Sequence, residues 1–334
     1  MERGSFRIDE AKTEDERQFD KENPMKKIFF ILGLMMAFLF LVAAKYDYFL
    51  EMGDKTVKSS ECNECHKLIY EEWSKDFHAK AYLNDSFKKG SKNYGAEECI
   101  GCHAAQDIRD EKNLKTRPVH KEEGINCTTC HLRNNMIYGP YKLESKHKTE
   151  QDESILKSEF CSGCHMPTFQ EWQASGSKKT CQECHMPRVE RKAVQGFLLS
   201  AVVPKRMVGQ HLQSYEKLLK EAALIIGEVG KGSVKISLTN RGVKHNMPTG
   251  KFGDYRIVLN TTVKDADGKT IFSKEEIFST LKKNGVPPQK TILLEYPILF
   301  EMGKRYKVSS TLLYQMEGRP DQSMTNWNVE FEGR

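Results

Sequence analysis

The chain has 334 residues, with 52 basic and 46 acidic side chains, a net charge of +6 and a mean hydropathy of −0.62. This composition predicts one or two globular domains and excludes collagenous, low-complexity and polytopic membrane proteins. The small positive excess forms no dense stripe of Lys and Arg, so we do not expect nucleic acid binding. All ten cysteines lie between Cys62 and Cys184, which indicates one segment with a specialised chemistry.

The N-terminal part of the chain predicts export. Residues 1–27 are polar and charge-mixed, and Ile28 to Ala44 are apolar or small, near the lower length limit of a membrane span. One interpretation is an uncleaved anchor in the cytoplasmic (inner) membrane, with a cytoplasmic tail and the bulk of the chain on the periplasmic side. The other is a start at Met25 and a signal peptide cleaved after Ala44, which would release a periplasmic protein. Both interpretations export the remaining chain.

Five copies of the pattern Cys-x-x-Cys-His use every cysteine of the chain. Two thiols three residues apart lie on one helical turn and can form thioethers with the two vinyl groups of a haem. The histidine that follows is then placed to bind the iron. The pattern therefore predicts five covalently bound haem c groups, on Cys62-Asn-Glu-Cys65-His66, Cys99-Ile-Gly-Cys102-His103, Cys127-Thr-Thr-Cys130-His131, Cys161-Ser-Gly-Cys164-His165 and Cys181-Gln-Glu-Cys184-His185.

Paired cysteines have two other common roles in proteins. An exported chain with an even number of cysteines can be held by disulfides, and paired Cys-x-x-Cys motifs can bind zinc. Neither use requires a histidine after the second cysteine. Because all five motifs carry that histidine in a chain with ten histidines, haem attachment is the favoured interpretation.

The motif segment is too short to wrap each haem in its own side-chain core. Five haems between Cys62 and His185 leave about 25 residues per haem. We therefore expect residues 45–205 to form a loop-rich domain with short helices, in which the haems themselves are the core. Such crowding brings neighbouring irons close enough for electron transfer.

Five histidines remain outside the motifs, one for each iron, and are candidates for the sixth, distal iron ligand. His211 falls on a predicted amphipathic helix, Gln210 to Gly227, within a linking segment at 206–228, and could instead be a hydrogen-bonded core residue. His245 falls in a turn-rich loop. The candidates are His78, His120, His147, His211 and His245.

Residues 229–334 contain no cysteine and predict an all-β, sandwich-like domain. We expect it to act as a structural cap that lends one haem ligand or docks a partner. Asp265 to Gly268 predicts a hairpin turn. The fold class is therefore mixed, with an N-terminal membrane helix, a haem domain and predicted strands at Ser233–Asn240, Tyr255–Val263, Thr270–Phe278, Thr291–Phe300, Arg305–Tyr314 and Trp327–Phe331.

The haem segment contains an internal repeat. His66 and His165 are each followed, at the same offsets of four, six and seven residues, by an aromatic residue, a glutamate and a tryptophan. The second copy has Ser177 at the position that corresponds to His78. The repeat indicates a scaffold built from related units, with Tyr70, Glu72 and Trp73 in the first copy and Phe169, Glu171 and Trp172 in the second.

Six short sequence motifs between residues 62 and 265 carry a resemblance to known proteins. They are Trp73-Ser74 with His78-Ala79, Gly124-Ile-Asn-Cys127, Phe160-Cys161-Ser-Gly-Cys164-His165, Cys181-Gln-Glu-Cys184-His-Met-Pro187, Gly209-Gln-His211 and His245-Asn-Met-Pro-Thr-Gly250. These motifs resemble the cytochrome c-554 family of multihaem cytochromes, and the last two are similar to a C-terminal module of exported multihaem cytochromes. The resemblance implies electron transfer among low-potential haems.

These features together predict a membrane-anchored respiratory electron carrier rather than an enzyme. Two histidines per iron leave no open position for a substrate. The expected partners are a quinol-oxidising donor or a soluble cytochrome and an outer acceptor, and the chain could also form an oligomer. Two alternatives stay open: a multihaem oxidoreductase that acts on nitrite or hydroxylamine at one five-coordinate haem, and a quinol-dehydrogenase subunit of a membrane complex.

Overall fold

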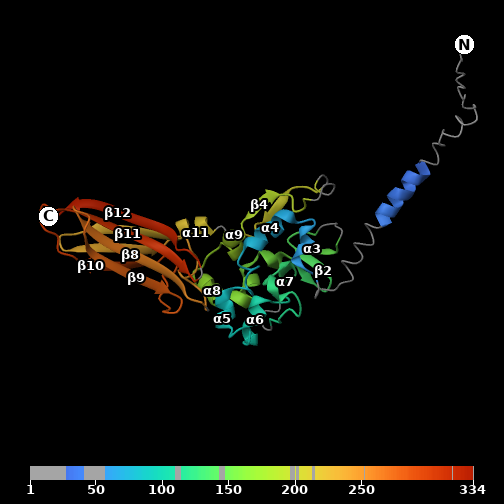
Figure 1. The fold of residues 1–334 in the computed structure, drawn as a ribbon, viewed down its shortest axis with the longest axis horizontal. Helices are drawn as coiled ribbons and strands as arrows, with labels where there is room; N and C mark the ends of the chain where they lie inside the picture. The colour runs from blue at the N-terminus through green and yellow to red at the C-terminus, as the bar shows by residue number, and fades with distance from the viewer. Residues whose placement is uncertain are drawn as a thin grey trace, which may run out of the picture. The chain divides into compact units, whose positions relative to one another are not determined.

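The computed structural model describes residues 28–40, 57–109, 114–142, 147–195, 200, 203–212, 215–251, 253–317 and 319–333 (Figure 1). The chain divides into two compact units, Met1–Met52 and Gly53–Arg334. All ten cysteines and all ten histidines belong to the second unit and to its described part.

Residues 28–40 of the first unit are helical, and their large apolar side chains are exposed, with Phe29 at 67% and Phe40 at 77%. No helix among the described residues is both long and apolar enough to cross a membrane. The predicted span continues to Ala44, and residues 41–44 lie outside the described part. The membrane anchor therefore stays a prediction.

The N-terminal half of the second unit consists of short helices and tight turns, as the sequence predicts, and of two small sheets that the sequence did not predict. The sheets have the orders β1-β2-β3 and β4-β5. The elements are α3 (Ser59–Asn63), α4 (Lys67–Lys75), α5 (Asp85–Gly90), α6 (Glu97–His103), η1 (Lys121–Glu123), α7 (Cys127–His131), β1 (Leu132–Arg133), β2 (Met136–Gly139), β3 (Thr149–Gln151), η2 (Glu153–Leu156), η3 (Ser158–Cys161), α8 (Ser162–Ala174), α9 (Cys181–His185), β4 (Arg188–Arg191) and β5 (Arg206–Gly209).

This half has little side-chain core of its own. Its one apolar cluster among the described residues consists of Phe87, Ile100 and Ala104, with Tyr82 and Tyr94 packed against it. A fold of this length normally buries a larger continuous apolar core. The small cluster fits the expectation that bound groups, not side chains, fill most of the interior.

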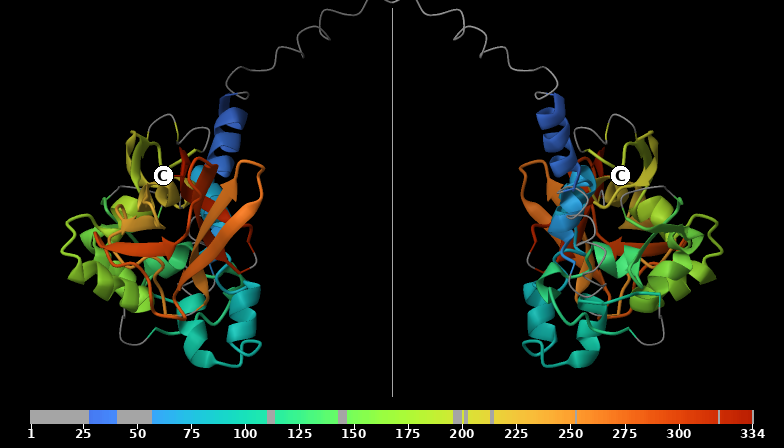
Figure 2. Two further views of the ribbon diagram at one scale, coloured as in Figure 1. Left: turned by 90° about the vertical axis from the view of Figure 1, so that its left-hand side faces the viewer. Right: turned by 90° about the vertical axis from the view of Figure 1, so that its right-hand side faces the viewer.

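The C-terminal half is built from α11 (Tyr215–Ala222) and two antiparallel sheets with one shared core. The sheets have the orders β10-β7-β6 and β12-β11-β8-β9 (Figures 1 and 2). On β7, Val234, Ile236 and Leu238 alternate with more exposed residues and are fully buried. The strands are β6 (Ala223–Val229), β7 (Ser233–Asn240), β8 (Tyr255–Asp265), β9 (Thr270–Ser279), β10 (Thr291–Pro297), β11 (Arg305–Met316) and β12 (Gln322–Glu332).

The predicted strands of this half are confirmed, and the predicted hairpin turn closes with a hydrogen bond of 3.0 Å from Gly268 N–H to the Asp265 carbonyl. The predicted helix over Gln210 to Gly227 is wrong in extent. The helix covers only Tyr215–Ala222, and β6 follows it directly. The reason is that Ile225 pairs with Leu238 of β7 and enters the shared core, where a β-branched residue fits a strand better than a helix. His211 consequently lies before the helix, not on it.

Candidate haem-binding site

The five Cys-x-x-Cys-His motifs, numbered 1 to 5 in chain order, each form a short helical turn. In motif 1 the His66 N–H donates to the Cys62 carbonyl at 2.9 Å, which is the i to i−4 bond of a helix. Side chains cap two of the turns: Asn126 accepts from the Thr129 N–H and Thr180 accepts from the Glu183 N–H. The turns place both thiols and the histidine of a motif on neighbouring positions of one face.

The structure brings the thiols of different motifs together. All ten cysteines are free and half-buried. Cys62 of motif 1 contacts Cys127 of motif 3, and this contact, with burial, raises the pKa of Cys62 well above its ordinary value. Equivalent contacts join Cys102 to Cys164 and Cys161 to Cys181. Motif 1 therefore lies beside motif 3, and motif 4 lies beside both motif 2 and motif 5.

Four of the five motif histidines face a histidine from outside the motifs. A metal–imidazole bond is about 2 Å long and an imidazole nitrogen lies about 1.1 Å from the ring centre, so two imidazoles on opposite sides of one ion have centroids about 6 Å apart. The four pairs have this separation: His66 and His147 at 6.3 Å, His78 and His165 at 6.2 Å, His131 and His211 at 6.1 Å, and His185 and His245 at 6.3 Å.

Hydrogen bonds at Nδ1 orient several of these rings. The Nδ1 of His66 lies 2.8 Å from the Ala193 carbonyl, and the Nδ1 of His131 lies 2.8 Å from the Tyr138 carbonyl. An Nδ1–H that donates to a carbonyl leaves the lone pair on Nε2, the arrangement typical of metal-binding histidines. His103, His211 and His245 make the same kind of Nδ1 contact with Ala81, Gly209 and Asn246.

The half-buried imidazoles are held in the neutral form. Burial lowers the pKa of His211 to about 4 and also lowers the pKa of His131 and of His245. At neutral pH these rings are therefore unprotonated, which a ligand to a metal ion must be. These neutral imidazoles are therefore suitable ligands for a haem iron.

Motif 2 differs from the others. All ten histidines are described, and among them His103 alone of the motif histidines has no histidine facing it. Its ring stacks on Phe87 at 3.7 Å with an interplanar angle of 8°. His120, the remaining candidate, lies in a left-handed turn (φ 54°) with its Nδ1 3.5 Å from a Glu122 oxygen. The structure therefore does not pair His120 with His103.

A fully buried arginine holds the turn that carries His120. Arg117 is 1% exposed, and its guanidinium donates to four backbone carbonyls and to the Thr129 hydroxyl of motif 3. One of these acceptors, Ala105, lies two residues after motif 2. The single side chain thus ties motif 2 to motif 3, and its carbonyl acceptors are Val119, Ala105, His120 and Gly124.

We expect Arg117→Met to lower the free energy of unfolding of the haem-loaded protein by about 3 kcal/mol or more, because it leaves several buried carbonyls without a donor. Arg133→Met is the matched control, since Arg133 is half-exposed and its ion pair with Asp107 spans 3.6 Å. That variant should stay within about 1 kcal/mol of wild type. Chemical denaturation followed by circular dichroism measures both, and equal losses would contradict the role given to Arg117.

Comparison with known proteins agrees with this geometry. Residues 61–132 match the family described as cytochrome c554 and c-prime. The fold is similar to the crystal structure of a penta-haem cytochrome c552 from Thermochromatium tepidum, with a TM-score of 0.63 and 18% identity, over 83% of this chain and 100% of that chain. The fold therefore resembles that of a penta-haem cytochrome, and residues 61–132 resemble the cytochrome c554 and c-prime family. A search of curated proteins found no match to this chain.

About a third of the chain also matches part of a putative β-galactosidase from Bacteroides fragilis. That match has 18% identity and a TM-score of 0.21, over 34% of this chain and 16% of that chain.

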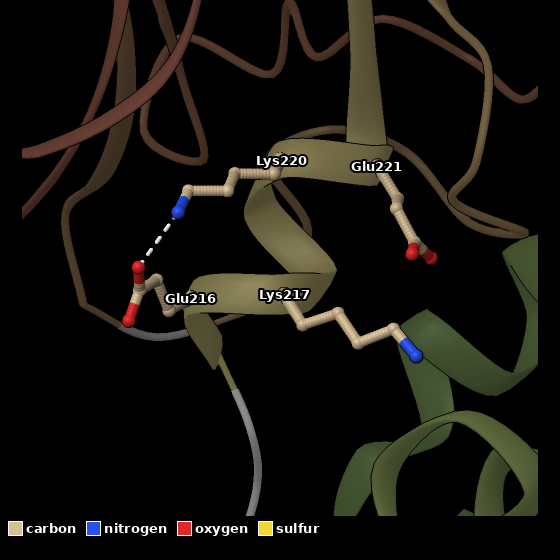
Figure 3. Close-up of a pocket in the computed structure, with 4 residues that line it drawn as sticks. All are labelled: Glu216, Lys217, Lys220 and Glu221. Atoms are coloured by element: carbon tan, nitrogen blue, oxygen red, sulfur yellow. Dashed lines mark hydrogen bonds and ion pairs between the residues drawn. The ribbon is translucent and has the colours of Figure 1, made fainter.

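One surface pocket of the described part of the chain lies on α11 (Figure 3). Its lining residues are Glu216, Lys217, Lys220 and Glu221, and the Lys220 ammonium lies 2.7 Å from a Glu216 oxygen. Glu216, Lys217 and Lys220 are exposed. A solvated set of paired charges does not provide the apolar enclosure that haem needs, so we do not assign a cofactor to this pocket.

Three residues that shape the site were not predicted from the sequence alone. These are Arg117, Arg191 and Glu72, of which only Glu72 belongs to the internal repeat. In the structure Arg191 forms a bidentate ion pair with Glu72, and the same Glu72 carboxylate accepts from the His211 N–H at 2.9 Å. The signal available in the sequence was the equal spacing of Glu72 and Glu171 after their motif histidines.

Proposed function

We propose that the chain is a cytochrome that carries five covalent haem c groups, one on each motif, and transfers electrons among them. The two cysteines of each motif form the thioethers and the motif histidine binds the iron. Haem c, when bound, supplies one reversible one-electron couple per iron.

The proposed distal ligands are the four facing histidines: His147 for motif 1, His211 for motif 3, His78 for motif 4 and His245 for motif 5. The observation that carries the proposal is the centroid separation of 6.1 to 6.3 Å in all four pairs. Two imidazoles favour the oxidised iron more than an imidazole and a thioether do, so these four sites are expected to have low potentials.

The contacts between motifs support a continuous route. Motif 1 contacts motif 3 through Cys62 and Cys127. Contact with Cys181 of motif 5, burial and the nearby thiol of Cys130 in motif 3 all raise the pKa of Cys161. Motif 4 is therefore the junction at which motifs 2, 3 and 5 meet.

We propose that this route lies on the outer side of the cytoplasmic membrane. The exposed apolar helix at residues 28–40, with the apolar sequence that continues to Ala44, supports an N-terminal anchor. A quinol-oxidising protein or a soluble cytochrome would supply the electrons, and an acceptor farther out would receive them. The role is thus that of a respiratory electron carrier.

The haem stoichiometry and potentials test the proposal. We expect the intact mass of the purified full chain to exceed the polypeptide mass by five haems, and the double variant Cys99→Ser/Cys102→Ser to lose one of them. A spectroelectrochemical titration should place most of the haems at low potential. A wild-type protein with four haems or fewer, or with mainly high-potential haems, would contradict the proposal.

The geometry of motif 2 favours a second candidate, an oxidoreductase that acts on a small nitrogen compound. His103 is not faced by a histidine, so the iron on this motif would keep one position open to a ligand such as nitrite or hydroxylamine. Steady-state reduction of either compound by the pre-reduced cytochrome would support this function. Binding without turnover would leave electron transfer as the function.

A further inference from the structure

The internal repeat is a repeat of structure as well as of sequence. His66 and His165 both interrupt a helix with nearly the same backbone angles, φ −101° and ψ 46° against φ −105° and ψ 34°. A helical segment follows each of them, α4 after motif 1 and the second part of α8 after motif 4. On both segments the aromatic residue and the tryptophan have ring centroids 5.5 Å apart. The two segments therefore present equivalent side chains, with the aromatic residue and the tryptophan at the same ring separation.

The two tryptophans contact equivalent points of two other motifs. The Trp73 Nε1–H donates to the Ile125 carbonyl at 2.8 Å, and the Trp172 Nε1–H donates to the Lys179 carbonyl at 2.8 Å. Ile125 lies two residues before Cys127 of motif 3, and Lys179 lies two residues before Cys181 of motif 5. Each tryptophan thus holds the chain that enters the neighbouring motif.

The two glutamates contact the histidine segments that face those same two motifs. The Glu72 carboxylate accepts from the backbone N–H of His211, which faces His131 of motif 3. The Glu171 carboxylate accepts from the backbone N–H of Asn246 at 3.0 Å, one residue after His245, which faces His185 of motif 5.

Further hydrogen bonds fix both carboxylates. Glu171 also accepts from the Asn246 side-chain amide at 2.8 Å and from the Thr249 hydroxyl at 2.6 Å, so three donors of the His245 loop converge on it. Glu72 is held by the bidentate guanidinium of Arg191. Hydrogen bonds to a carboxylate are stronger than those between neutral groups.

We propose that Glu72 and Glu171 are positioning residues, each of which fixes the distal histidine of the haem on a neighbouring motif, motif 3 for Glu72 and motif 5 for Glu171. In each case one helix holds both sides of a haem site, the motif through its tryptophan and the facing histidine through its glutamate. The inference rests on the proposed ligand set. Groups that orient a metal ligand typically contribute 10- to 100-fold to its binding.

Cyanide binding to the oxidised, haem-loaded full chain tests this inference. Cyanide binds an open ferric haem, so wild type is expected to bind one equivalent tightly, at motif 2. Glu171→Ala should bind a second equivalent of cyanide, at motif 5. We expect its affinity to be roughly 10- to 100-fold higher than the affinity with which cyanide displaces the distal histidine of that motif in wild type. His245→Ala defines the signal of a fully open motif 5, and Gln170→Ala, an exposed neighbour on the same helix, is the matched control.

The outcomes separate the inference from the ligand assignment beneath it. A second cyanide site in His245→Ala with none in Glu171→Ala would overturn the positioning role and leave the assignment intact. No added site in His245→Ala would overturn the assignment itself. Retention of five haems and of the low-spin signals of the other irons shows that the variants are folded.

The first copy of the internal repeat, which contains Glu72, allows the same test at motif 3. Glu72→Ala is expected to open motif 3 to cyanide in the same way, with His211→Ala as its reference. Glu71→Ala is the control, because Glu71 is the exposed neighbour of Glu72 on α4. A cyanide site in Glu71→Ala equal to that in Glu72→Ala would contradict the inference.

Discussion

Replacing His78 with methionine is expected to raise the reduction potential of the haem on motif 4 by on the order of 0.1 to 0.3 V, within the range of about 0.8 V over which axial ligands set haem potentials. His78 faces His165 with ring centroids 6.2 Å apart. A thioether in place of the imidazole stabilises the reduced iron. The iron would keep six ligands, so the change in potential can be measured without an open site.

The effect of this substitution should extend beyond one haem. Motif 4 contacts motif 2 through Cys164 and Cys102 and motif 5 through Cys161 and Cys181. A more oxidising centre at this junction would retain electrons and slow their transfer to the other haems. Rapid-mixing reduction followed by reoxidation measures that rate.

His120→Met is the matched control for this prediction, because the ring contacts with the motif histidines involve the other four candidates. We expect its potentials and its reoxidation rate to match those of wild type. A shift in His120→Met equal to that in His78→Met would contradict the assignment of His78.

Gly124→Ala is expected to lower the free energy of unfolding by about 3 kcal/mol or more, the sum of backbone strain and overpacking at about 1 to 3 kcal/mol each. Gly124 has φ 60° and ψ −127°, a conformation that side chains oppose. An added Cβ would lie 2.3 Å from the His78 carbonyl oxygen. Because the next residue, Ile125, donates its N–H to that same carbonyl at 2.9 Å, relief of the clash must move the segment that carries His78.

Gly139→Ala is the control for this substitution. Gly139 lies at the end of β2, and an added Cβ would meet no heavy atom within 4 Å. We expect its stability to remain within about 1 kcal/mol of wild type. Thermal unfolding of the haem-loaded proteins, with the low-spin signal of motif 4 as a second readout, compares them. If Gly124→Ala kept the stability and the haem ligation of wild type, the close approach of the His78 carbonyl oxygen to residue 124 would be contradicted.

The sequence was sufficient to predict the features that depend on neighbouring residues. The motif turns need only a fixed spacing of Cys, Cys and His, and a strand such as Ser233–Asn240 is marked by alternation. The short helix before β6 was predicted too long because Ala222 and Ile225 continue the apolar face of the helix, whereas in the structure Ile225 already belongs to β6.

The pairing of histidines could not be predicted, since it depends on contacts between distant parts of the chain. Five spare histidines for five irons suggested one each, but no local pattern states that His147 faces His66 or that His211 faces His131. The turn of His120 is set by Arg117, whose five acceptors lie on three stretches of the chain, at Ala105, at Val119 to Gly124 and at Thr129. The role of Glu171 likewise depends on a loop more than seventy residues later, where Asn246 and Thr249 meet it.

The most direct test of this account is the electron paramagnetic resonance spectrum of the fully oxidised protein, quantified against a haem count by pyridine haemochrome. The four histidine pairs and the single unpaired His103 predict four low-spin irons and one high-spin iron per chain. Five low-spin irons would contradict the account, because a further ligand would then complete motif 2. Two or more high-spin irons would contradict it as well, because at least one of the four histidine pairs would then not bind iron.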